Sequence, residues 1–142
     1  MAASLNLKGL PDGALVLIDT APIVRWLEGD PQQNLRLRPL FEAHDAGRVR
    51  FAVTASTLAE VLTGPLGAGD EALARRYRAV LETWRVVPFD AGIAETAARL
   101  RGALALPFPE ALQAASALAI NAAALVTEGE EFERVTGLRV IG

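Results

Sequence analysis

Short apolar segments alternate with amphipathic segments along the whole chain. The clearest apolar segment, residues 14–18, holds five apolar residues without a break and ends at Asp19. An uninterrupted run of this length is typical of a strand buried on both faces in a parallel sheet. Apolar or alternating runs predict four further strands, at residues 48–53, 85–89, 123–127 and 138–141.

The segments between these runs carry helix patterns and helix-end residues. Thr20 and Ser56 stand where an N-cap is expected, Asp70 and Asp90 precede two further helices as caps, and Gly64–Pro65 is a stop signal. The pattern predicts helices at residues 21–28, 32–46, 57–63, 71–84, 91–104 and 111–122, then one helical turn at 132–135. Strands that alternate with helices indicate an α/β class with a mainly parallel sheet.

Composition narrows the class of protein. The chain has 142 residues, 51% of them hydrophobic, which suits a single domain, residues 1–142, with a substantial core. It has no cysteine, which fits a reducing compartment. The first residues lack the basic region and apolar run of a signal peptide, and no segment is long and apolar enough to span a membrane. We therefore expect a cytoplasmic protein.

Charge gives no general signal for nucleic-acid binding, since the net charge is −3. Thirteen of the fourteen basic residues are arginines, a side chain that favours bidentate phosphate contacts, although the genome's base composition explains this bias equally well.

Acidic residues follow the apolar segments at positions that a parallel sheet would bring together. Asp19 ends the first strand, Glu60 follows the second, and Glu110 opens the helix rich in small residues. An acidic cluster, residues 128–131, follows the strand at 123–127. Carboxyl ends of parallel strands share one edge of the sheet, where open α/β sheets bind ligands. We expect these acids to converge there.

Converging carboxylates repel one another unless a cation lies between them. Oxygen ligands alone favour Mg²⁺ or Mn²⁺, and such an ion can polarise a phosphoryl oxygen and activate water. A single histidine and no cysteine argue against zinc. Each acid also has a simpler interpretation: Asp19 as a helix cap, Glu60 and Glu110 as helix-surface acids, and residues 128–131 as a solvated turn.

The order of these segments resembles the PIN domain, specifically the small toxin ribonucleases of the VapC type. The segments that carry the resemblance are residues 17–24, 56–65, 106–116 and 125–127, with Glu131 and Phe132 after the last of them. They extend over nearly the whole chain in the family's order and spacing. No single segment is highly specific, but their combination is.

The resemblance implies a PIN-like three-layer α/β/α fold and Mg²⁺- or Mn²⁺-dependent cleavage of RNA. It also implies that the protein pairs with an antitoxin and, as is common in the family, forms a homodimer. No membrane association is implied. Asp19 and Glu60 match the family's first two acids in kind, and Glu110 stands where the family has aspartate. Gly129 replaces another aspartate, for which Glu128 or Glu130 is a substitute, and Glu131 matches a further acid. The implied catalytic acids are Asp19, Glu60 and Glu110, which bind metal together with Glu128 and Glu131, supported by the hydroxyls of Thr20 and Thr127.

Two other functions remain open from the sequence. Glu110 and Gly129 motivate a degenerate PIN-like domain without nuclease activity that acts as an RNA- or protein-binding module. A phosphatase or phosphotransferase with Asp19 as nucleophile is a weaker hypothesis. Enzymes of the haloacid-dehalogenase type need a second aspartate two residues later, where this chain has Ala21.

Overall fold

The computed structural model describes residues 4–142, and its centre is a five-stranded, all-parallel sheet. Met1–Ala3, the start of the segment that lacks signal-peptide features, lie outside the described residues. The strand order β3-β2-β1-β4-β5 places β1 at the centre. The strands are β1 (Ala14–Ile18), β2 (Val49–Thr54), β3 (Arg85–Val87), β4 (Ala124–Val126) and β5 (Val140–Ile141).

The helices lie where the sequence predicts them, with shifted ends. Their bounds are α1 (Thr20–Leu27), α2 (Pro31–Asp45), α3 (Ala55–Gly67), α4 (Glu71–Glu82), α5 (Ala91–Leu104), α6 (Phe108–Ala119) and the 3-10 helix η1 (Glu130–Arg134). Asp70 and Asp90 cap α4 and α5 as predicted, because their Oδ1 atoms accept from the backbone N–H of Leu73 and Ile93.

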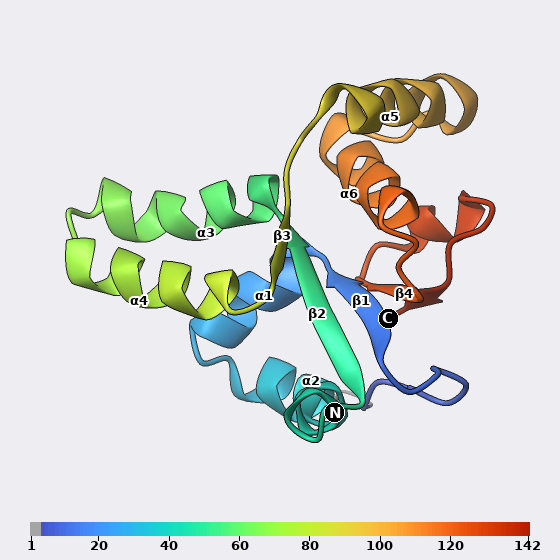
Figure 1. Cartoon of the computed structure of the whole chain (residues 1–142). Coiled ribbons are helices and arrows are strands. Elements are labelled where there is room, and N and C mark those ends of the chain that lie inside the picture. The colour runs from blue at the N-terminus through green and yellow to red at the C-terminus, as the bar shows by residue number, and fades with distance from the viewer. Residues whose placement is uncertain (1–3) are drawn as a thin grey trace.

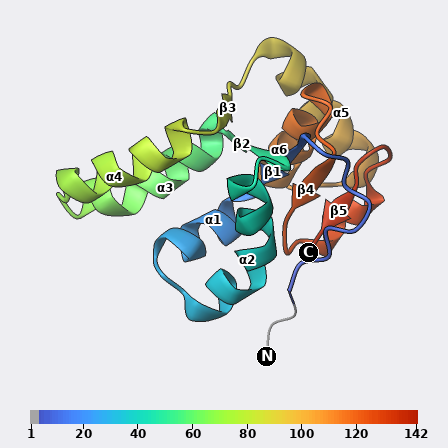
Figure 2. The ribbon, with the colours of Figure 1, turned by 60° about the horizontal axis from the view of Figure 1, so that its bottom comes forward.

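Alternate residues of β1 face the two halves of the core. Val16 and Ile18 pack with α1 and α2, whereas Leu15 and Leu17 pack with α5 and α6, and all four are buried. The sheet therefore has helices on both faces, and the predicted three-layer α/β/α fold is confirmed (Figure 1). Both ribbon views show the α3–α4 hairpin extending away from the sheet (Figure 2).

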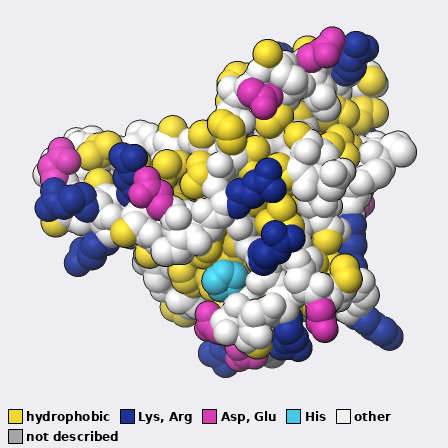
Figure 3. All heavy atoms as spheres, viewed as in Figure 1, with side chains coloured by type: hydrophobic (Ala, Val, Ile, Leu, Met, Phe, Trp, Pro, Cys, Tyr) yellow, Lys and Arg dark blue, Asp and Glu magenta, His cyan; other side chains and the backbone are white. Residues whose placement is uncertain are grey.

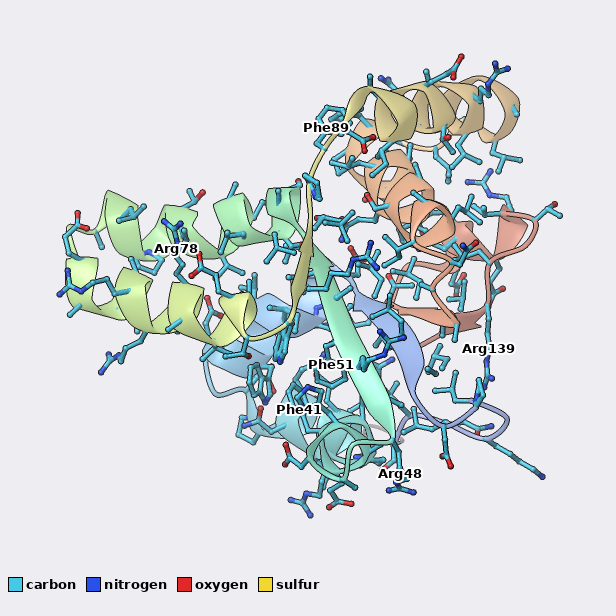
Figure 4. All side chains as sticks on the ribbon, in the orientation of Figure 1. Phe41, Arg48, Phe51, Arg78, Phe89 and Arg139 are labelled. Carbon is cyan, nitrogen blue, oxygen red and sulfur yellow. The ribbon has the colours of Figure 1, made fainter. Side chains whose placement is uncertain are left out.

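An aromatic cluster anchors α2 to the sheet. Trp26 of α1 stacks on Phe41 of α2 with ring centroids 4.3 Å apart, and Phe41 meets Phe51 of β2 edge-on at 5.2 Å. Figure 4 shows Phe41 and Phe51 between α2 and β2. His44 stacks on Phe51 with ring centroids 4.2 Å apart, so the single histidine is part of this aromatic cluster.

The predicted starts of α1 and α3 are wrong by one or two residues. Asp19, not Thr20, is the N-cap of α1, and its Oδ1 accepts a hydrogen bond from Thr20 N. Thr54, not Ser56, is the N-cap of α3, because its Oγ1 accepts from Thr57 N three residues later. Both helices thus begin directly at the end of a strand, without an intervening turn.

The predicted end of α3 and the predicted start of α6, both in segments that contain proline, also differ from the structure. Gly64–Pro65 does not end α3, which continues to Gly67; proline removes only one backbone bond there, and Pro65 is buried. In α6 the helix begins at Phe108 rather than at residue 111. Pro109 fits within this first turn, since its missing N–H would have had no partner inside the helix.

Charged side chains of both signs are intermingled on the face shown in Figure 3, without a dominant basic surface. Within residues 4–142, no helix is long and apolar enough to cross a bilayer.

Candidate active site

Asp19 and Thr127 lie side by side at the carboxyl edge of the sheet. They directly follow Ile18 and Val126, which are partners in the register of β1 and β4, and Asp19 N continues the ladder by donating to Val126 O at 2.9 Å. The Thr127 hydroxyl donates to Asp19 Oδ2 at 2.7 Å and accepts from Gly129 N at 3.0 Å. The second bond orients the hydroxyl so that its proton points to Asp19.

A cleft of about 390 Å³ opens beside Asp19, where α1, α3 and α6 begin. Three of the predicted acids line this cleft: Asp19, Glu60 and Glu110. The fold thus brings these three residues, which are distant in the sequence, to one cleft. The rest of the lining consists of Thr20, Ala21, Val24, Arg25, Ser56, Pro109 and Gln113.

Asp19 is held by three hydrogen-bond donors. Its Oδ1 accepts from Thr20 N at 2.9 Å and from Gln113 Nε2 at 3.0 Å, and its Oδ2 accepts from Thr127. Asp19 is therefore both a helix cap and a cleft-lining carboxylate, and the two interpretations of the sequence are compatible. Three donors on a half-buried carboxylate fix its orientation.

Glu110 and Glu60 have different environments. Glu110 is half-buried in the first turn of α6, and its Oε2 atom is buried with no hydrogen-bond partner among residues 4–142. A buried carboxylate oxygen without a partner is costly unless a cation or water pairs with it. Glu60 is exposed on α3 and is one of the residues that line the cleft.

Glu128 lies outside the cleft and is paired with two arginines. It forms a salt bridge with Arg25 Nη2, and its Oε1 lies 3.5 Å from Arg36 Nη1. The hydrogen bond that the Arg25 guanidinium donates to Glu128 raises the pKa of Arg25, and desolvation by partial burial opposes this shift. Glu128 and Glu130 line a separate hollow beside η1, so the structure does not bring either of them to Asp19.

Glu131 occupies the space left by the missing side chain of Gly129. A Cβ at position 129 would lie 2.8 Å from Glu131 Oε1, closer than Cβ atoms approach a neighbour. Phe132, which follows, is fully buried and fixes this turn against the core. The Glu131 carboxylate therefore lies over residue 129, but it is not part of the cleft lining around Asp19.

Sequence reasoning missed the polar residues beneath Asp19. Gln113, Thr54 and Thr57 are each at most 3% exposed and are joined by hydrogen bonds of 2.7–3.2 Å. Thr57 Oγ1 in turn lies 2.7 Å from Thr20 Oγ1, so the Thr20 hydroxyl contacts Thr57 rather than Asp19. Two features of the sequence point to these residues. One is the lone glutamine in an apolar helix, and the other is a threonine at the end of β2, where β1 is followed by Asp19.

The cleft residues fit a divalent cation in their chemistry. Three carboxylates and no nitrogen or sulfur ligand suit Mg²⁺ or Mn²⁺, and the unpartnered Glu110 Oε2 is an available oxygen ligand. Among the described residues, no three acidic or histidine side chains are gathered closely enough to form a ready-made metal site. Binding would therefore draw the flexible Glu60 and Glu110 side chains toward Asp19.

The sequence model of the PIN domain family matches residues 16–138. This range includes β2, β3 and β4 in full and β1 from Val16 onward, and it ends before β5. The chain belongs to the PIN domain family. No curated protein sequence matches it.

Solved structures share the fold at low sequence identity. A toxin–antitoxin complex from Klebsiella pneumoniae is 24% identical, with a TM-score of 0.68 over 87% of this chain and 94% of that one. VapBC2 from Rickettsia felis, bound to a DNA fragment from its promoter, is 22% identical with a TM-score of 0.72 over 89% and 96%. Mycobacterium tuberculosis VapC20, a toxin that cleaves the sarcin–ricin loop, is 16% identical with a TM-score of 0.66 over 89% and 99%.

Proposed function

We propose that this PIN domain is a divalent-metal-dependent endoribonuclease and the toxin of a toxin–antitoxin pair. The observation that carries the proposal is the cleft at the carboxyl edge of the sheet, which Asp19, Glu60 and Glu110 line. Asp19, held by three hydrogen bonds, is the fixed ligand, and the two glutamates complete the set. Mg²⁺ or Mn²⁺ bound there would polarise a phosphoryl oxygen and lower the pKa of a water molecule.

The protein's own groups then bind and orient the RNA. Arg25 lines the same cleft and places a guanidinium near the acids, where it can contact a phosphate. Its salt bridge with Glu128 ties the Arg25 side chain to the loop after β4, so this charge is held in place before substrate binds. The Thr20 hydroxyl, also in the cleft lining, is a further hydrogen-bonding group for the substrate.

An exposed aromatic pair supports single-stranded RNA as the substrate. Phe89 and Phe108 are 52% and 44% exposed, with ring centroids 6.2 Å apart, and the Arg101 guanidinium lies 5.8 Å from the Phe108 ring. Phe108 directly precedes Pro109 and Glu110, which line the cleft. Figure 4 shows Phe89 above β3, beside the start of α5. Exposed rings next to a guanidinium are suited to stack on nucleic-acid bases.

The partner we propose is an antitoxin, with a homodimer as the assembly. Support comes from the toxin–antitoxin complexes among the similar folds and from a second groove of about 460 Å³ between α1, α3 and α4. Leu27, Val61 and Tyr77 line this groove, which meets the cleft at Val24 and Glu60. An apolar antitoxin segment in the groove would end beside the acids.

One observation favours a second candidate, a PIN-like binding module without nuclease activity. The acids of the described chain are not pre-assembled as a metal cluster. Calorimetric titration with Mn²⁺ separates the two functions, since the binding module predicts no saturable site that depends on Asp19.

The decisive test is RNA cleavage by the purified full chain. We expect cleavage with Mg²⁺ or Mn²⁺, none with EDTA, and none by Asp19→Asn prepared in the same way. Glu95→Gln removes an exposed acid on α5 and is the matched control, which should cleave like the wild type. Cleavage that persists undiminished in Asp19→Asn would overturn the assignment.

A further inference from the structure

Gln113 is a buried amide in α6, a helix whose other buried residues are apolar except for Ser116. It is 3% exposed, and its buried neighbours in α6 are mostly alanines. Burial of an amide is unfavourable unless its hydrogen bonds are made, so a glutamine here requires specific partners. One of them is Asp19, since Gln113 Nε2 lies 3.0 Å from Asp19 Oδ1.

The orientation of the Gln113 amide is set at both ends. An ionised carboxylate only accepts hydrogen bonds, so the amide nitrogen must face Asp19. The amide oxygen then faces Thr54, whose hydroxyl donates to Oε1 at 2.7 Å. Thr54 Oγ1 is itself fixed as the cap of α3, because it accepts from Thr57 N at 3.0 Å. Rotation of the amide by 180° would bring its oxygen against the carboxylate.

The second N–H of the amide is also used. Gln113 Nε2 lies 3.2 Å from Thr57 Oγ1, and that hydroxyl lies 2.7 Å from Thr20 Oγ1. The network thus joins the end of β2 and the starts of α1 and α3 to α6. Among the side chains of this network within residues 4–142, Gln113 is the one that hydrogen-bonds to a cleft carboxylate, that of Asp19.

We propose that Gln113 is a positioning residue that holds Asp19 ready to bind the cation, with Thr54 fixing the Gln113 amide. A carboxylate offers about four acceptor positions. Asp19 Oδ1 accepts two hydrogen bonds, from Thr20 N and Gln113 Nε2, and Oδ2 accepts one from the Thr127 hydroxyl. One acceptor position on Oδ2 therefore remains for the cation. This inference rests on the proposed function, since it assigns a role in the same site.

The test is Mn²⁺ binding by calorimetry on the full chain, with thermal unfolding in EDTA as a parallel measurement. Gln113→Met keeps the length and removes the hydrogen bonds. Thr54→Val removes the hydroxyl from a residue that touches neither Asp19 nor the cleft, and Thr54→Ser restores it. Ser116→Ala is the packing control, because Ser116 is buried on the same helix and, among residues 4–142, its hydroxyl hydrogen-bonds only to Leu112 O.

We expect Gln113→Met to raise the Mn²⁺ Kd by about 10- to 100-fold, the usual effect of removing a group that orients a metal ligand. Thr54→Val should raise it several-fold, whereas Thr54→Ser and Ser116→Ala should stay within about twofold of the wild type. A melting temperature lowered equally by Gln113→Met and Ser116→Ala, with unchanged Kd values, would reduce Gln113 to a packing role and overturn the inference.

The outcomes also separate this inference from the proposed function. If the wild type binds Mn²⁺ and Gln113→Met binds it equally well, only the inference fails. If the wild type shows no saturable Mn²⁺ binding that Asp19→Asn removes, the proposed function fails, and the positioning role fails with it.

Discussion

Thr127 donates its hydroxyl proton to Asp19 Oδ2 at 2.7 Å, although the two residues are far apart in the sequence. The contact follows from the parallel register of β1 and β4, which places the residues after Ile18 and Val126 beside each other. The fold thus supplies the first carboxylate of the cleft with a fixed donor from the neighbouring strand.

Thr127→Val should lower both stability and metal affinity. It removes the donor to Asp19 and the acceptor of Gly129 N from a buried position, which costs about 1–3 kcal/mol of unfolding free energy. Thr127→Ser keeps the hydroxyl and should recover most of both losses. Urea denaturation and Mn²⁺ calorimetry measure the two effects, and equal stability of the valine and serine variants would contradict this account.

Glu110→Gln should stabilise the metal-free protein while weakening metal binding. It replaces a carboxylate whose buried Oε2 has no described partner with a neutral amide that is less costly to bury, so we expect a gain of about 1 kcal/mol in EDTA. The Mn²⁺-induced rise in melting temperature should disappear. Glu110→Asp keeps the charge and should retain part of that rise. A Glu110→Gln protein that Mn²⁺ stabilises like the wild type would show that Glu110 is not a ligand.

Glu128→Gln should leave Mn²⁺ affinity within about twofold of the wild type, because Glu128 is paired with Arg25 and Arg36 and lies outside the cleft. Loss of these partly exposed pairs should cost at most about 1 kcal/mol. Glu60→Gln is the comparison, and there the Mn²⁺ Kd should rise. Mn²⁺ calorimetry on both variants distinguishes the positions, and loss of binding in Glu128→Gln would show that this side chain enters the cleft.

Phe108→Ala should weaken the binding of single-stranded RNA, measured by fluorescence anisotropy in EDTA, where no cleavage occurs. Stacking of one base is worth about 1–3 kcal/mol, which corresponds to a rise in Kd of roughly 5- to 150-fold. Leu35→Ala, an equally exposed apolar residue on α2, should bind RNA like the wild type. Unchanged RNA affinity together with loss of a dimer on gel filtration would assign the aromatic pair to a protein interface.

The sequence predicted the sheet and the position of Asp19 at the end of β1 because both depend on local pattern. The apolar run of β1 can only be buried on both faces, and Asp19 necessarily stands at its end. The same pattern located Glu110, since a helix start next to the sheet edge also faces the cleft.

Other features depend on contacts between distant segments, which the pattern does not encode. Glu128 pairs with Arg25 of α1, which lies more than a hundred residues earlier in the chain, and Gln113 meets Asp19 because α6 packs on the sheet. The starts of α1 and α3 were missed for a local reason. Asp19 directly follows β1, and Thr54 is the last residue of β2. Each of them is also the N-cap of the next helix, so no separate capping residue stands between strand and helix.

Anomalous diffraction from crystals soaked in MnCl₂ tests the central claim most directly, because it shows whether and where an ion binds. We predict a manganese peak in the cleft, within coordination distance of Asp19 Oδ2 and of carboxylate oxygens from Glu60 and Glu110, and no peak there in Asp19→Asn crystals. A fully soaked wild-type crystal with no peak at this cleft, or with one only beside Glu128, would contradict the account.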